Sequence, residues 1–185
     1  RDSRLSGERL QKAFTAGATR LGEDVTQFGL ASTPSMFMAT VTSGYDFDGA
    51  VMLTASHLPK NRNGLKFFTS GGGLEKADIA EILSIAGEGG FQPAPEAGVV
   101  ESLDFLSLYA KGLVETIRKG VNAPDYERPL AGFHIVVDAG NGAGGFFVDR
   151  VLDPLGADTT GSQFLERDGN FPNHTPNPED PAAMD

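Results

Sequence analysis

Apolar and polar positions along residues 1–69 follow two periods, one helical and one strand-like. Apolar residues three and four positions apart share one face of a helix, whereas short apolar runs between turn residues are typical of strands. Thr33 before Pro34 is expected to cap the second helix, because proline suits the first helical position. The predicted elements are a helix over 8–21, a strand over 25–30, a helix over 33–42, and strands over 49–54 and 66–69. This alternation predicts a layered α/β domain.

The rest of the chain continues the pattern, with a change near residue 130. The expected elements are a flexible hinge at 70–73, a helix over 74–86, a Pro- and Gly-rich linker over 88–98, a helix over 102–119, a strand over 134–137, a helix over 146–152 and a weak strand over 159–165. The segment 122–129 is polar, holds two prolines and precedes a new strand. We therefore expect a domain boundary near residue 130.

Composition places the chain among acidic globular proteins. It has 185 residues, of which 39% are hydrophobic and 22% charged, enough to bury a core. The net charge of −10 argues against nucleic acid or an anionic membrane as the main partner. The chain has no cysteine, so disulfides and cysteine nucleophiles are excluded. No apolar run approaches the roughly 18 residues of a membrane span and no signal peptide is visible, so a soluble protein is expected. Its compartment, the cytoplasm or an organelle such as a plastid, stays open.

Candidate chemistry is concentrated in a polar segment over 54–66, which we call the serine loop. It holds Ser56 and lies between two predicted strands, where a loop can present a hydroxyl to solvent. Serine is a poor nucleophile alone and needs a base or an attached phosphate. Three cations in the loop would stabilise a dianionic phosphate, and these are Lys60, Arg62 and Lys66. On residue types alone, the loop also fits ordinary turn chemistry. Arg1 and Arg4 could reach a phosphate or could simply be solvated.

A second candidate is the spacing Gly140-x-Gly142-x-x-Gly145, after a predicted strand and before a helix. This spacing invites a dinucleotide-binding interpretation, in which the ribose acid would have to be Glu166. The helix that follows meets Pro154 within about two turns. We favour a tight strand-to-helix turn whose glycines permit close packing.

The serine loop resembles the phosphoserine loop of the α-D-phosphohexomutases, the phosphoglucomutase/phosphomannomutase family. The matching segments are Thr-Ala-Ser-His-x-Pro at 54–59 and Asn-Gly-x-Lys at 63–66. Leu58 stands where the family usually has asparagine. Three further segments resemble the family in its own order, at 1–7, 136–144 and 168–179. The resemblance therefore covers nearly the whole chain.

The resemblance implies a fold and a division into domains. It implies a three-layer α/β/α domain with a mixed sheet over 1–130, the family's first domain with its N-terminus truncated. The beginning of a second, similar α/β/α domain would follow over 131–185. In the family, the first domain usually starts with a further strand. The family's metal-binding loop and sugar-selecting loop would correspond to positions beyond residue 185.

The resemblance also implies an activity and a set of site residues. The family moves phosphate between C1 and C6 of a hexose phosphate, through a phosphoserine and a hexose bisphosphate, with Mg²⁺. Ser56 would carry the phosphate and bind Mg²⁺ through it, with His57 and Lys66 as catalytic residues and Arg62 and Asn63 as phosphate-binding residues. A histidine here could act as an acid or base or could fix the loop as a donor.

Two functions stay open at this point. The first is a phosphosugar mutase of carbohydrate metabolism whose partners are hexose phosphates and bisphosphates, with no nucleic acid and no membrane. Its other metal ligands would lie beyond residue 185, so residues 1–185 alone are expected to be inactive. The second is a non-catalytic relative that binds sugar phosphates, which Leu58 favours. The resemblance leaves the hexose undecided among glucose, mannose and glucosamine.

Overall fold

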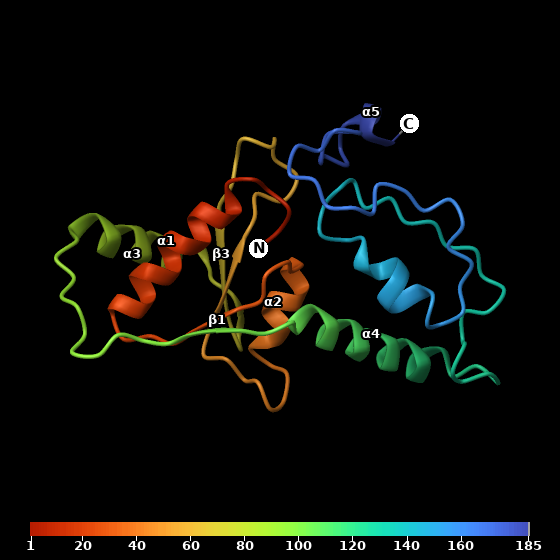
Figure 1. Ribbon diagram of the computed structural model, residues 1–185, viewed down its shortest axis with the longest axis horizontal. Helices are drawn as coiled ribbons and strands as arrows, with labels where there is room; N and C mark the ends of the chain where they lie inside the picture. The colour runs from red at the N-terminus through yellow and green to blue at the C-terminus, as the bar shows by residue number, and fades with distance from the viewer. Residues whose placement is uncertain (185) are drawn as a thin grey trace.

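The computed structural model of the protein describes residues 1–184. Along the chain, the elements are α1 (Gly7–Arg20), β1 (Val25–Gln27), α2 (Thr33–Ala39), β2 (Ala50–Leu53), β3 (Leu65–Thr69), β4 (Gly72–Gly73), α3 (Lys76–Glu88), β5 (Val100–Ser102), α4 (Phe105–Val121), the π-helix η1 (Val148–Leu152) and α5 (Pro181–Met184) (Figure 1). The helices expected over 8–21 and 102–119 are confirmed as α1 and α4, within three residues at each end.

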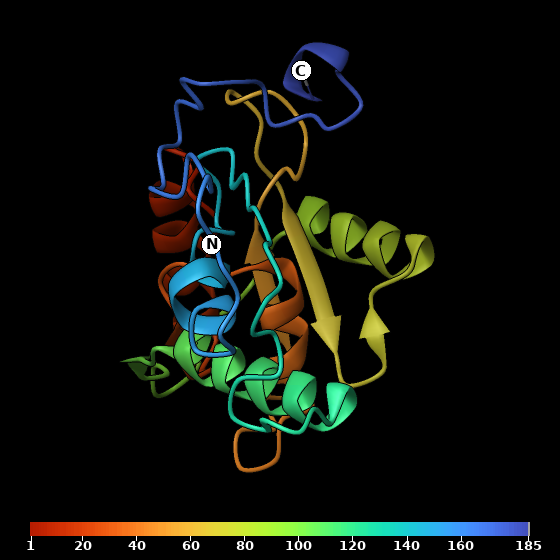
Figure 2. The ribbon, with the colours of Figure 1, turned by 90° about the vertical axis from the view of Figure 1, so that its right-hand side faces the viewer.

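The strands pair in both senses. β1 runs parallel to β5, while β2, β3 and β4 form an antiparallel sheet in that order. Figure 2 shows β2 and β3 with α3 on one side and α2 and α4 on the other. A cavity of about 430 Å³ lies between the two sheets. At one end of this gap, Asp2 N–H donates to Leu53 C=O at 3.1 Å and Ala31 N–H donates to Arg1 C=O at 2.9 Å. Residues 1–2 therefore link the end of β2 to the segment after β1.

The cap of α2 differs from the prediction by one residue. Ser32, not Thr33, is the N-cap, and its hydroxyl accepts from Ser35 N–H at 3.3 Å while Ser32 N–H donates to the Ser35 hydroxyl at 3.0 Å. Both residues are good caps, but only a cap at Ser32 allows this reciprocal pair of bonds.

The glycine run at 70–73 is not a free hinge. Gly72 and Gly73 form β4, which pairs with Thr69 and Phe68 and closes a tight hairpin. The following helix α3 begins at Lys76 and ends at Glu88, two residues beyond the predicted end, with Gly89 as its C-cap. Gly89 has a φ of 62°, a left-handed conformation that glycine adopts easily.

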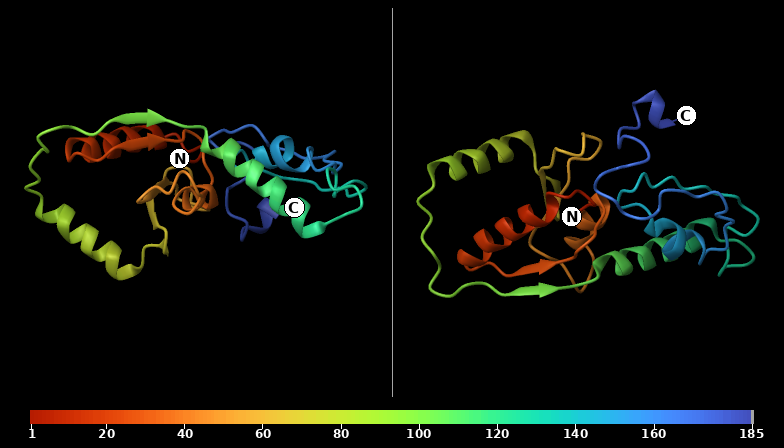
Figure 3. Two further views of the ribbon diagram at one scale, coloured as in Figure 1. Left: turned by 90° about the horizontal axis from the view of Figure 1, so that it is seen from below. Right: turned by 45° about the horizontal axis from the view of Figure 1, so that its top comes forward.

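The main core joins α4 to the segment 146–155. Leu106, Ala110 and Val114 of α4 are buried with three residues from the second half, which are Phe146, Val151 and Leu155. The helix begins at Phe105 because the Asp104 carboxylate accepts from Ser107 N–H at 3.1 Å. The views in Figure 3 show α4 running from the β5 end toward η1 and joining the two halves of the molecule.

The strands expected at 134–137 and 159–165 lie side by side but form no regular ladder. Their pairing is limited to isolated parallel bridges, His134 with Asp158 and Asp138 with Gln163. Val136 is 53% exposed, so the outer face of this segment lacks the cover that stabilises a full strand. His134 is exposed as well, and its ring Nε2 contacts Thr160 C=O at 2.7 Å.

Candidate active site

The serine loop leaves the end of β2 as two consecutive turns. Leu58 N–H donates to Ala55 C=O at 3.0 Å, and Arg62 N–H donates to Pro59 C=O at 2.9 Å. The loop closes where Thr54 N–H donates to Gly64 C=O at 3.0 Å. The Asn63–Gly64 pair therefore lies at the base of the loop and does not form its tip.

Ser56 is exposed at the first of these turns, in a left-handed conformation with a φ of 54°. Such a conformation costs a non-glycine residue about 1–2 kcal/mol. Hydrogen bonds to both neighbouring peptide groups offset the cost, because Ser56 N–H donates to Thr54 Oγ1 at 2.9 Å and Ser56 C=O accepts from Arg4 at 2.7 Å. The backbone of Ser56 is thus fixed while its side chain faces solvent.

The side chain of Arg4 holds the serine loop through its carbonyl groups. Its side chain is fully buried, and Nε donates to the Asp2 carboxylate at 3.2 Å. The two terminal nitrogens donate to four loop carbonyls at 2.7–3.0 Å, those of Ser56, Leu58, Pro59 and Arg62. All five N–H groups of the guanidinium are therefore used. From the sequence, Arg4 could be either solvated or near a phosphate. In the structure it is buried and bonded to the serine loop, and we call its side chain the clamp.

Asp2 connects the clamp to the strand that carries the loop. Its Oδ2 accepts from the Thr54 hydroxyl at 2.7 Å, and the same threonine oxygen accepts from Ser56 N–H. A closed network therefore runs from Arg4 through Asp2 and Thr54 to Ser56 and back to Arg4. Sequence reasoning did not find this network, although an aspartate two residues before an arginine is a local signal for such a pair.

Of the other four predicted site residues, three have side chains that are exposed and without partners in the described part of the chain, and one is bonded within the fold. His57, Arg62 and Lys66 are exposed, and within residues 1–184 their side chains form no hydrogen bond or ion pair. The Asn63 amide donates to the Ser6 hydroxyl at 3.0 Å and its oxygen accepts from Gly64 N–H, so it ties the loop to the start of α1. The roles of these four residues stay predictions.

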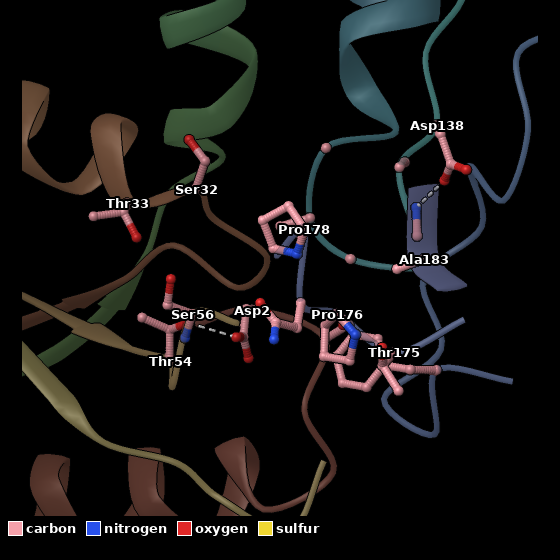
Figure 4. A pocket seen from close by; sticks show the side chains of 18 of the residues that line it. Asp2, Ser32, Thr33, Thr54, Ser56, Asp138, Thr175, Pro176, Pro178 and Ala183 are labelled. Carbon is pink, nitrogen blue, oxygen red and sulfur yellow. Dashed lines mark hydrogen bonds between the residues drawn. The ribbon is translucent and has the colours of Figure 1, made fainter. Parts of the chain in front are cut away.

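Ser56 opens onto a pocket of about 560 Å³, a volume typical of small-ligand sites. Asp2, Thr54 and Ser56 lie on one side, and Asp138 lies on the other, with Pro176 and Pro178 between (Figure 4). Ser32 and Thr33 at the start of α2 complete the wall. Among the five predicted site residues, Ser56 is the one that lines this pocket in the described part of the chain.

The far wall of the pocket holds an ion pair that sequence reasoning missed. The ring of His174 contacts Asp138 Oδ1 through Nε2 at 3.1 Å and Thr175 C=O through Nδ1 at 2.9 Å. Both partners are acceptors, so the ring serves both only when both nitrogens carry protons. The bond to Thr175 and the carboxylate of Asp138 accordingly raise the pKa of His174 above its ordinary value. Burial raises the pKa of Asp138, but the hydrogen bonds it accepts outweigh burial and leave this pKa below 3.8.

We expect this pair to stabilise the protein at mildly acid pH and to lose that effect as the pH rises. A raised folded-state pKa for His174 adds stability below 6.5, its ordinary value, which is lost as the pH passes through the folded-state pKa. The effect should be no more than about 1 kcal/mol, because the pair is partly exposed. Melting temperatures of the wild type and His174→Gln, compared from about pH 5.5 to about pH 8.5, would check this. A difference between the two proteins that does not change with pH would contradict it.

The glycines after the 134–137 segment permit close packing, as predicted. A Cβ at Gly145 would lie within 2.2 Å of Leu165 C=O, and one at Gly140 within 2.9 Å of the His174 ring. Gly140 also has a φ of 51°. These glycines bring the turn against the segment that carries His174, which supports the tight-turn interpretation over a dinucleotide site.

Metal binding by this chain alone finds no support in the side chains. Residues 1–184 contain no group of three His, Asp or Glu side chains that could hold a metal ion. Mg²⁺ prefers a preorganised set of oxygen ligands that includes protein carboxylates. Within residues 1–184, no helix has the length and apolar character needed to cross a membrane.

Comparison with known proteins now defines the class. A family model described as phosphoglucomutase/phosphomannomutase, alpha/beta/alpha domain I, matches residues 1–93, and the corresponding domain II model matches residues 109–185. The chain belongs to the phosphoglucomutase/phosphomannomutase family. The resemblance found in the sequence and the expected α/β/α fold with a mixed sheet are both confirmed. The boundary expected near residue 130 stays a prediction. We call the two matched segments domain I and domain II.

Individual relatives agree with the family. A phosphoglucomutase from Neisseria gonorrhoeae is 36% identical over 185 residues, covering 100% of this chain and 37% of the relative. A phosphomannomutase/phosphoglucomutase from Pseudomonas putida is 33% identical, again covering 100% of this chain and 37% of the relative. The crystal structure of a phosphoglucomutase/phosphomannomutase family protein from Burkholderia thailandensis matches with a TM-score of 0.75 and 28% identity, over 94% of this chain and 36% of that one. The chain thus spans just over a third of the length of these relatives.

Proposed function

We propose that this chain is the phosphoryl-carrying part of a phosphohexomutase. The observation that carries the proposal is the presentation of Ser56: its peptide groups are fixed by Thr54 and Arg4, and its side chain is exposed at a pocket between domains I and II. A group held in one geometry at a pocket suits phosphoryl transfer, which depends mainly on positioning and charge neutralisation.

In the proposed reaction, Ser56 begins as a phosphoserine. A free hydroxyl of a hexose phosphate attacks the phosphorus, the bond to Ser56 Oγ breaks, and a bond to the sugar oxygen forms. The product is a hexose bisphosphate, which turns over and returns its other phosphate to Ser56. The proton of the attacking hydroxyl needs a base, and the exposed ring of His57 is our candidate.

The cations of the serine loop would neutralise the transferred phosphate. Lys66 lies on β3 opposite Met52 and is exposed, as is Arg62 at the end of the second turn. Neither the Lys66 nor the Arg62 side chain has a hydrogen-bond or ion-pair partner within residues 1–184 that a phosphate would have to displace. Asn63, already bonded to Ser6, would bind phosphate through the second N–H of its amide.

Mg²⁺ remains part of the proposal as a cofactor of the complete enzyme. This chain would supply one ligand, an oxygen of the Ser56 phosphate, and we assign no step to the metal. The expectation that residues 1–185 alone are inactive stays a prediction.

The names of the relatives support hexose phosphates as substrates. They include phosphoglucomutase, phosphomannomutase and phosphoglucosamine mutase, so the sugar of this protein stays open among these three. Hexose phosphate and hexose bisphosphate are the proposed partners.

The alternative is a non-catalytic relative that binds sugar phosphates. It is favoured by Leu58, whose side chain is 45% exposed beside the serine where the family usually has a polar residue. The loop, however, uses the backbone of Leu58: its N–H donates to Ala55 and its C=O accepts from Arg4. Leu58 therefore leaves the backbone of the loop intact, and the enzyme remains the function that we propose.

We expect the full-length protein to carry phosphate on Ser56 after incubation with glucose 1,6-bisphosphate. Trypsin would release Ser56 in the peptide 21–60, which also holds Ser32, Ser35 and Ser43. Fragment spectra of this peptide would locate the label. Phosphate on one of the other three serines, or none after the incubation, would refute the central claim.

A further inference from the structure

Arg4 lies between the serine loop and a turn of domain II. The ring of Phe171 covers one face of the guanidinium, with the Arg4 Cζ 5.4 Å from the ring centroid. Beside this contact, Gly169 packs directly on the backbone that carries Arg4, since a Cβ at Gly169 would lie 2.3 Å from Ser3 C=O and 2.8 Å from Leu5 N. Domain II thus contacts the clamp through an aromatic face and a glycine that admits no side chain.

The contact with Phe171 is suited to keeping water from the clamp. The five N–H groups of Arg4 all point outward in the plane of the guanidinium and are all bonded, so its two faces are what remains to be covered. An arginine face packs well on an aromatic ring, and the attraction is stronger where water is excluded. If the ring moved away, water could reach the guanidinium and compete for the carbonyls of the serine loop.

The turn that carries Phe171 is itself firmly held. Phe171 N–H donates to Asp168 C=O at 3.0 Å, and Asp168 N–H donates to the carbonyl of the buried Asn141 at 2.9 Å. The amide of Asn141 also donates to Glu166 C=O at 2.8 Å. Phe171 has a φ of 49°, an unusual conformation for a bulky residue that the packing around it must maintain. The turn therefore moves with the body of domain II.

We propose that Phe171 and Gly169 are positioning residues that couple the placement of domain II to the geometry of Ser56. Seating of the turn on Arg4 completes the burial of the clamp, and the clamp fixes the carbonyl of Ser56. Separation of the turn from Arg4 loosens the serine loop and lowers the rate of phosphoryl transfer. The rate effect rests on the proposed function, whereas the effect on loop order does not.

Hydrogen exchange in the full-length protein tests the coupling directly. We expect Phe171→Leu to speed amide exchange in the serine loop roughly tenfold and to leave the rest of domain I unchanged, because a leucine fills space without offering an aromatic face. Phe171→Tyr keeps that face and should restore slow exchange. Gly169→Ala should act as Phe171→Leu does, by pushing the turn off residues 3–5. Phe133→Leu and Gly112→Ala are the matched controls, since Phe133 is exposed and a Cβ at Gly112 meets open space.

Kinetics supply the second measurement. Phe171→Leu should lower kcat roughly tenfold and change KM less than about twofold, because it disturbs the serine and, in the pocket lining, only replaces one apolar side chain by another. Exchange that rises equally throughout domain I, or that does not rise in the serine loop, would overturn the coupling. If Ser56 of the wild type accepts no phosphate while loop exchange responds as expected, the proposed function fails and the coupling stands.

Discussion

Replacing Ser56 by alanine in the full-length protein is expected to abolish mutase turnover and to leave the fold intact. The hydroxyl is the proposed carrier of the phosphate, and alanine removes it. By comparison with other enzymes that form a covalent intermediate, we expect a loss of at least about 10⁴-fold in kcat. Stability should change little, because the side chain is exposed and the network uses only the peptide groups of Ser56. A coupled assay of glucose 1-phosphate conversion, with glucose 1,6-bisphosphate as activator, would measure the loss.

A matched control is available at the far end of β3. Ser70 is also exposed, and Ser70→Ala should retain turnover within about twofold. Melting temperatures of the two variants should agree with that of the wild type. Turnover by Ser56→Ala at a rate near that of the Ser70 variant would show that another group carries the phosphate.

The parts of the fold that sequence predicted best depend on local spacing. In α4, for example, Leu106 and Ala110 are four residues apart and so lie on one face of the helix, and both are buried in the core. The position of Ser56 after a strand was also readable, because the motif and the apolar run that precedes it are contiguous. The predicted cap of α2 is one residue off, since serine and threonine are both common caps and the bond to Ser35 selects Ser32.

The parts that sequence did not predict depend on distant contacts. Arg4 reaches carbonyls 52–58 residues away, and Asp138 meets His174 across 36 residues. A charged residue is normally solvated, and no periodicity reports its burial. Which side chains share a pocket depends on how the two domains pack, so Ser56 could be proposed from the sequence whereas the wall opposite it could not.

The strands expected in domain II show a further limit. The apolar run at 134–137 is typical of a buried strand, yet Val136 is half exposed and the pairing is restricted to isolated bridges. The run correctly identified two segments that lie side by side. Regular strand geometry requires neighbours on both faces and edges, which a local pattern does not report.

Arg4→Lys should destabilise the full-length protein by at least about 2 kcal/mol and should disorder the serine loop. Lysine keeps the charge but offers three donors from one point, whereas the structure has five acceptors arranged around a planar guanidinium. At least two of these partly buried acceptors would lose their bond to Arg4, at about 1 kcal/mol or more each. Arg4→Met should cost more, about 3–5 kcal/mol, because it also leaves the Asp2 carboxylate without its counter-charge.

The control is Arg9→Lys on the exposed surface of α1, which should change stability by less than about 0.5 kcal/mol. Thermal melting followed by circular dichroism would rank the three variants, and equal melting temperatures for Arg4→Lys and Arg9→Lys would show that the guanidinium does not hold the loop.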